Sequence, residues 1–63
     1  DAGELDPIID KIIEANQRQA QEFRNGKEGL LGFFVGQVMK ETGGKADPRV
    51  VNDRVRTKLA AGV

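Results

Sequence analysis

Apolar residues recur along the chain at helical spacing, in four blocks that polar residues and glycines separate. The blocks predict helices over about 7–15, 17–25, 28–42 and 48–60. No block alternates between apolar and polar residues as a strand does. We therefore expect an all-α fold, a small bundle of three to four short helices in a single domain over 1–63, with the apolar third helix at its centre. The expected core contacts are Ile8, Ile9, Ile12 and Ile13; Ala20 and Phe23; Leu30, Leu31, Phe34, Val35, Val38 and Met39; and Val51, Val55 and Leu59.

Capping residues predict where these helices begin and end. Aspartate accepts hydrogen bonds from the free amides at a helix start, and proline suits the first helical position. Asparagine followed three residues later by glutamine resembles a capping box, and glycine is common just beyond a helix end. These rules predict starts at Asp6-Pro7 and Asp47-Pro48, a capping box at Asn16 and Gln19, and ends at Gly26 and Gly43-Gly44.

The third block contains three glycines, Gly29, Gly32 and Gly36, each of which costs a helix about 1 kcal/mol against alanine. At 100° per residue they form one stripe. The favoured explanation is close approach of another helix, the first or the fourth, which predicts that Gly32→Leu unfolds the domain. Close approach of a ligand is the alternative. Phe33 lies away from the main apolar face, so either a second element covers it or it is offered to a partner.

Composition narrows the class of protein. A chain of 63 residues that begins with Asp1 is expected to be a module or a fragment cut from a longer protein. Its longest apolar run is far shorter than the roughly 20 residues of a membrane span, so a soluble domain is expected. Residues 1–14 carry five acidic residues and one basic residue, whereas 15–63 carry nine basic and five acidic residues. This asymmetry favours an anionic partner for the C-terminal part.

The residue types argue against catalysis by this chain. It contains no His, Cys, Ser or Tyr, so the usual nucleophiles and proton carriers are missing. Asp10 and Glu14 lie one turn apart, and a solvated helix face explains them better than an acid/base pair or a metal site. The Gly-Lys pairs at 26–27 and 44–45 lack the spacing of a phosphate-binding loop. We expect no catalytic residue, no metal site and no cofactor in this segment.

A basic stripe is the main candidate for binding. Arg49, Asn52 and Arg56 recur on one face of the fourth predicted helix, where planar guanidiniums could grip a nucleic-acid backbone. Lys40 and Lys45 lie near the start of the stripe, and Lys27 lies in the turn before the third helix. On spacing alone, solubilising charges on an exposed face are the commoner explanation.

The sequence resembles a known family. The run GKEGLLGFFVGQVMK at 26–40, followed by GKADP at 44–48 and Val51-Asn52, resembles the C-terminal tail domain of GatB, the B-type component of the aspartyl/glutamyl-tRNA amidotransferase, which is similar to YqeY-like proteins. The specific likeness covers about 23–59. The chain departs from the family at Asp47, where asparagine is more usual, and at Gln17, where proline is frequent.

The resemblance implies a role in protein biosynthesis. The parent would be a carbon–nitrogen ligase that uses ATP, Mg²⁺ and glutamine-derived ammonia to convert Glu-tRNA(Gln) or Asp-tRNA(Asn) to the amidated forms. Its partners would be the glutamine or asparagine tRNA and, through the parent, the amidase component GatA and the small component GatC, in the cytoplasm, with no membrane or DNA. The tail would be a non-catalytic module that holds tRNA, and the expected tRNA-binding residues are Lys27, Lys40, Lys45, Arg49, Asn52 and Arg56.

Since Phe33 and the glycine stripe could instead receive a helix, the alternative is a protein-docking module that packs on another protein or domain without touching RNA. RNA binding should weaken steeply with salt, whereas docking should not. The absence of Tyr and Trp argues against stacking on splayed bases and favours recognition of RNA shape and backbone.

Overall fold

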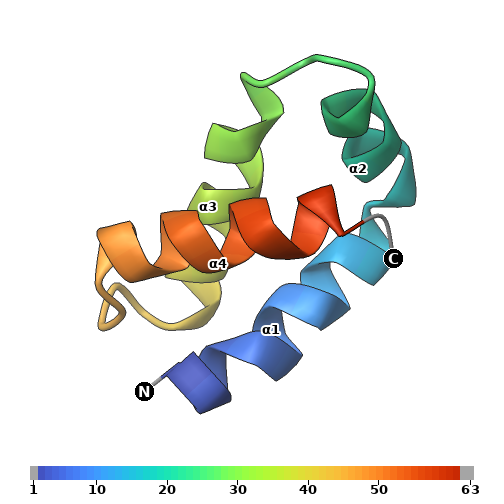
Figure 1. Cartoon of the computed structure of the whole chain (residues 1–63). Coiled ribbons are helices and arrows are strands. Elements are labelled where there is room, and N and C mark those ends of the chain that lie inside the picture. The colour runs from blue at the N-terminus through green and yellow to red at the C-terminus, as the bar shows by residue number, and fades with distance from the viewer. Residues whose placement is uncertain (1, 62–63) are drawn as a thin grey trace.

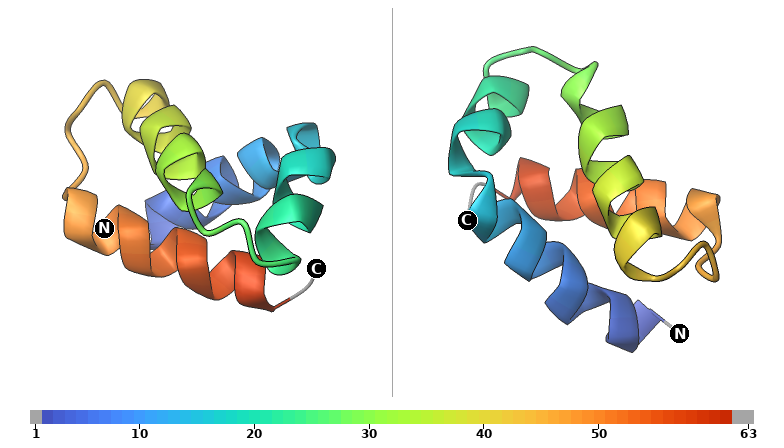
Figure 2. Two further views of the ribbon diagram at one scale, coloured as in Figure 1. Left: turned by 90° about the horizontal axis from the view of Figure 1, so that it is seen from above. Right: turned by 180° about the vertical axis from the view of Figure 1, so that it is seen from behind.

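The computed structural model describes residues 2–61, which fold into four helices (Figure 1). They are α1 (Ala2–Ala15), α2 (Gln17–Arg24), α3 (Leu30–Glu41) and α4 (Pro48–Ala60). No strand occurs within this part of the chain, so the predicted all-α bundle is confirmed. Figure 1 shows α4 crossing in front of α3, with α1 running beside α4. The further views place the α2–α3 and α3–α4 connections at different ends of the bundle (Figure 2).

All four helices contribute to one apolar core, as their hydrophobic spacing predicts. Phe34 of α3 is its largest fully buried side chain. The predicted line on α4 is confirmed, because each of its three residues is 0% exposed. Every pair of helices is in contact around this core. The buried members are Leu5, Ile9, Ile12, Ile13, Ala20, Leu31, Phe34, Val38, Val51, Val55 and Leu59, and Ile8, Phe23, Val35, Met39 and Ala46 pack against them half-buried.

The first helix begins earlier than the Asp6-Pro7 signal predicts. It starts at Ala2, so Pro7 lies inside the helix and Asp6 is not its N-cap. Pro7 has no amide hydrogen to donate to the carbonyl one turn earlier. The loss affects a single bond near the helix start, and five residues upstream still extend the helix. Because Asp6 does not cap α1, its carboxylate is free to reach another helix.

Asp6 forms a forked ion pair with Arg54 of α4. Nε and Nη2 of Arg54 donate to Oδ1 of Asp6 at 3.1 and 2.6 Å, and Nη2 also donates to Oδ2. One turn further along both helices, Nζ of Lys58 lies 2.9 Å from Oδ1 of Asp10. Since the two pairs keep the same sequence offset, α1 and α4 run in the same direction. The acidic N-terminal segment therefore neutralises one flank of α4.

The connection between α1 and α2 contradicts the predicted capping box. Asn16 makes no side-chain hydrogen bond at the start of α2. Its Nδ2 instead donates to the carbonyl oxygen of Ile12 at 2.8 Å, and Nε2 of Gln17 donates to the carbonyl of Ile13 at 3.1 Å. The last carbonyls of a helix have no partner within it, so both amides satisfy the end of α1 rather than the start of α2.

The other predicted helix ends are confirmed by their hydrogen bonds. Beyond α2, the amide of Gly26 donates to the carbonyl of Phe23 and that of Lys27 to the carbonyl of Glu22, at 3.0 and 3.1 Å. This is a Schellman motif, and Gly26 supplies its left-handed residue with a φ of 112°. The same pattern at Gly43 and Gly44 ends α3. At the start of α4, Oδ1 of Asp47 accepts from the amide of Arg49 at 2.9 Å.

The glycine stripe is not a packing seam, so the favoured explanation is wrong. Gly32 and Gly36 are exposed, and a Cβ added at either one, or at Gly29, would meet nothing within 4 Å. Neither α1 nor α4 approaches them. At 100° per residue the stripe lies on the far side of α3 from the buried line, so neighbouring helices cover the opposite face. Gly32→Leu is accordingly expected to fold.

We expect stability to depend on pH through Asp6. Hydrogen bonds from Arg54, aided by its charge, hold the pKa of the Asp6 carboxyl below its ordinary value of 3.8 despite partial desolvation. The folded chain therefore binds this proton less readily than the unfolded chain, and the stabilisation is present above pH 3.8 and lost as pH falls through the folded pKa. Urea unfolding should show Asp6→Asn less stable than wild type at neutral pH, with the gap closing in acid.

Glu14→Gln is the matched control, because Glu14 is an exposed acid on the same helix and forms no ion pair within residues 2–61. It should follow the pH profile of the wild type. A constant gap between Asp6→Asn and wild type from neutral to acid pH would contradict a role for this carboxylate's charge.

Removing a stripe glycine should stabilise the chain. Gly36 lies in the interior of α3 with open space beside it, so Gly36→Ala should raise the free energy of unfolding by about 0.5–1 kcal/mol. Gly26→Ala provides the contrast, since its positive φ makes a side chain there cost about 1–3 kcal/mol. Chemical unfolding followed by circular dichroism measures both. Destabilisation by Gly36→Ala would reveal a neighbour that the fold does not show.

Candidate nucleic-acid interface

The two flanks of α4 carry cations in different surroundings. Arg54 and Lys58 face α1 and pair with its acids. The predicted stripe of Arg49, Asn52 and Arg56 lies on the other flank, with both arginines exposed and the asparagine half-buried. The buried line of α4 separates these flanks. The structure therefore leaves the stripe turned away from the acidic segment.

Arg56 ties this stripe to the beginning of α3. Its Nη1 lies 4.0 Å from Oε1 of Glu28, in the turn that precedes the helix. The two side chains are 52% and 76% exposed, so solvent screens the pair and it contributes little to stability. An anionic ligand could replace Glu28 at low cost. The contact also shows where the stripe lies, since Arg56 of α4 is next to the start of α3.

The three predicted lysines occupy different parts of the surface. Lys27 is exposed in the α2–α3 turn, next to Glu28. Lys40 is exposed in the last turn of α3 and shares the helix face of Gly36. Lys45 lines a depression between the start of α1 and the α3–α4 connection, together with Leu5 and Val50. Lys27 and Lys40 therefore flank the two ends of α3, whereas Lys45 adjoins a surface shared with α1.

Four of the predicted cations are electrostatically unsatisfied. Within residues 2–61, no ion pair involves Lys27, Lys40, Lys45 or Arg49. By comparison, Nε of Arg24 donates to the carbonyl of Leu59 at 2.8 Å and so holds the end of α4 against α2. The cations that hold the fold together and those that remain available are thus different residues.

Sequence reasoning missed the outer face of α3 as part of this surface. Phe33 is 36% exposed and lies between the uncovered glycines, with Lys40 two turns along the helix. The signal was present in the sequence, because the glycines and Lys40 share one side of the helical wheel while the buried line occupies the other. The explanation of the glycines by helix packing led instead to the expectation that another helix covers this face. We call the set Gly29, Gly32, Phe33, Gly36 and Lys40 the outer face of α3.

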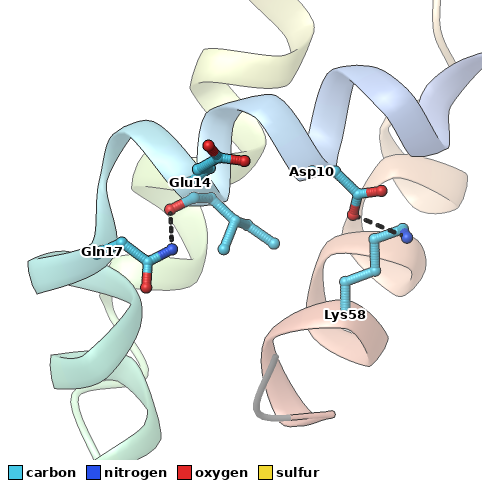
Figure 3. Close-up of a pocket in the computed structure, with 5 residues that line it drawn as sticks. Asp10, Glu14, Gln17 and Lys58 are labelled. Atoms are coloured by element: carbon cyan, nitrogen blue, oxygen red, sulfur yellow. Dashed lines mark hydrogen bonds and ion pairs between the residues drawn. The ribbon is translucent and has the colours of Figure 1, made fainter.

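Two acids of α1, Asp10 and Glu14, line a second depression. Asp10, Ile13, Glu14, Gln17 and Lys58 line it where α1 meets α2 and α4 (Figure 3). Asp10 is held by Lys58 and Gln17 by the Ile13 carbonyl, so only Glu14 lacks a partner in the figure. Among residues 2–61, no group of three His, Cys, Asp or Glu residues could hold a metal ion.

No helix in the described part of the chain has both the length and the apolar character needed to cross a membrane.

Comparison with known proteins agrees with the family resemblance of the sequence. The profile of the GatB domain family matches residues 1–59. Relatives named as the B component of aspartyl/glutamyl-tRNA(Asn/Gln) amidotransferase are 59% identical in Rippkaea orientalis, over 94% of this chain, and 53% identical in Carboxydothermus hydrogenoformans, over 95%. The chain spans about 12% of the length of each. No solved structure matches significantly.

Proposed function

Because the chain belongs to the GatB domain family, we propose that it is a tRNA-binding and positioning module of a tRNA-dependent amidotransferase. Its parent would convert Glu-tRNA(Gln) or Asp-tRNA(Asn) to Gln-tRNA(Gln) or Asn-tRNA(Asn) in the cytoplasm, together with the amidase component GatA and the small component GatC. The module itself would bind tRNA without catalysing a step. The observation that carries this proposal is the separation of charge across α4.

The acids of α1 pair with one flank of α4, and the remaining cations lie where an anionic partner can reach them. Arginine forks suit phosphate oxygens, and Arg49 and Arg56 sit two turns apart on a rigid helix. Contacts of this kind fix position on a nucleic acid without reading its bases. A module that holds tRNA, rather than identifying it, requires contacts of this type.

The outer face of α3 supports the same proposal. Two of its glycines, Gly32 and Gly36, lie inside the helix and cost it about 2 kcal/mol in propensity. No packing within residues 2–61 explains them, because an added Cβ would meet no other part of the fold within 4 Å. A bare helix surface lets a bulky partner such as an RNA strand come close to the backbone. Packing inside this chain no longer explains the glycines, so approach of a partner does, and the cations nearby favour RNA over a helix of another protein.

ATP and Mg²⁺ would bind elsewhere in the parent, since the residues described here do not fit them. No cluster of metal-binding side chains occurs among residues 2–61, and Lys27 and Lys45 follow glycines without the spacing that cradles phosphates. The residues of this chain would supply binding energy and orientation only, which is the contribution that remote binding makes to catalysis.

Removing the arginine stripe should weaken tRNA binding without unfolding the chain. Arg49→Ala with Arg56→Ala removes two phosphate contacts, so we expect lower affinity for a glutamine tRNA transcript and a salt slope that falls by about 1.5 to 2. Lys11→Ala with Arg18→Ala is the matched control, because both are exposed and form no ion pair within residues 2–61. Filter binding across a salt series gives both quantities, and circular dichroism checks the fold.

Two results would count against the proposal. Equal losses in the stripe variant and the control variant would mean that net charge, rather than this surface, attracts RNA. Failure of the wild-type chain to bind tRNA at low salt would reject RNA binding altogether. Association with another Gat protein that does not change with salt would then favour the docking alternative.

Releasing Arg56 should have the opposite effect. Glu28→Gln removes the carboxylate that competes with phosphate for this arginine, so tRNA affinity should rise by about two- to fivefold at low salt and less at high salt. Glu14→Gln on α1 controls for the change in net charge. An equal rise in both variants would show that the effect does not depend on Arg56.

A further inference from the structure

Phe33 is a bulky apolar side chain that the fold leaves partly exposed and holds in contact with the core. It is 36% exposed on the outer face of α3. Its ring meets that of Phe34 at a centroid distance of 5.3 Å and an angle of 82°, an edge-to-face contact. Since Phe34 is fully buried in the core, this contact anchors an exposed ring to an immobile one. Phe33 is therefore a preorganised aromatic surface.

The residues around Phe33 leave its ring accessible. Side chains one turn away on the same face normally cover a helical residue, at positions i−4 and i+3 among others. For Phe33 these positions are Gly29 and Gly36, and the preceding residue is Gly32. Apart from chain neighbours and the backbone of α3 itself, no atom lies within 4 Å of where their Cβ atoms would be. A flat group could therefore approach the ring from the glycine side of the helix.

The charges nearby indicate what kind of group fits. Lys40 lies on the same face of α3, and Arg56 and Lys27 lie beside the start of this helix. Cores of protein interfaces are depleted in lysine and need a broad apolar patch. Here a single exposed ring has glycines before it and one turn away on either side, half-buried Leu30 and Gln37 beside it, and a lysine further along the same helix face. An aromatic ring with cations on either side suits a ligand that is flat and attached to phosphates.

We propose that Phe33 stacks on a nucleobase of the bound RNA, while the neighbouring cations hold the phosphates on either side of that base. This inference rests on the proposed function and deepens it, since it adds a base contact to a surface otherwise suited to the backbone. It also revises the expectation that a chain without Tyr or Trp does not stack. A single phenylalanine can stack where part of its ring is exposed, as it is here.

Two substitutions test the ring itself. Phe33→Leu keeps an apolar side chain but loses the aromatic face, and should weaken binding of a glutamine tRNA transcript by about 5- to 30-fold. The salt slope should stay unchanged, because no phosphate contact is lost. Phe33→Tyr retains the ring and should bind within about twofold of wild type. Circular dichroism confirms that both variants fold.

A fluorescence measurement tests stacking directly. The chain has no tryptophan, so Phe33→Trp creates a single reporter, whose emission should be strongly quenched when tRNA saturates it. Ala15→Trp is the matched control, because Ala15 is exposed but lies at the end of α1, the helix that carries the acids. Its emission should change little.

Unchanged tRNA affinity in Phe33→Leu would overturn the stacking proposal, as would equal quenching at the two positions. If wild type binds tRNA and Phe33→Leu binds equally well, stacking alone fails and the proposed function stands. If wild type does not bind tRNA, both fail. Loss of association with another protein upon Phe33→Leu, with RNA affinity intact, would assign this ring to a protein contact instead.

Discussion

One shared apolar core is the constraint on which everything else in this chain depends. Its helices are 8 to 14 residues long, and isolated helices shorter than about 12–15 residues are marginal in water. The chain has no cysteine, so no disulfide supplements this core. Each helix persists because it buries side chains against the other three, and α2 illustrates the limit, since Ala20 is its only fully buried residue within the described chain.

The core also determines how charge is distributed. With Val51, Val55 and Leu59 fixed inward, α4 has two flanks, and only one of them can face α1. That flank carries Arg54 and Lys58, which meet Asp6 and Asp10. The forked pair is well formed but a third or more exposed, so it orients the two helices more than it stabilises them. The exposure of Arg49 and Arg56 on the other flank is a consequence of helix packing.

Local rules predicted what depends on local chemistry. The Asp47 cap, the glycine ends of α2 and α3 and the buried line of α4 each involve residues within a turn of one another, and all are confirmed. The rules failed where tertiary contacts decide. Asp6 does not cap α1, because the helix begins upstream of it at Ala2. Asn16 does not cap α2, because its side chain donates to the carbonyl of Ile12 at the end of α1 instead.

In the candidate site too, the sequence predicted what helical spacing determines but not what the packing of other helices determines. Helical spacing alone places Arg49, Asn52 and Arg56 on one face, whether or not they bind RNA. What spacing could not reveal is which face of α3 the other helices would cover. Glycine is compatible with both a crowded seam and a bare surface, so its presence does not distinguish them; only the positions of α1 and α4 do.

The division of charge between α1 and the rest of the molecule has a consequence for how the chain meets a polyanion. Its formal net charge is zero, so at long range it is neither attracted nor repelled. Yet residues 1–14 carry five acids and one base, and residues 15–63 carry nine bases and five acids, so the charge is divided as in an electric dipole. In the field of an approaching nucleic acid such a dipole experiences a torque, within about 10 Å at ordinary ionic strength. Encounter would then be governed by rotation, with α1 turned away from the RNA before any contact forms.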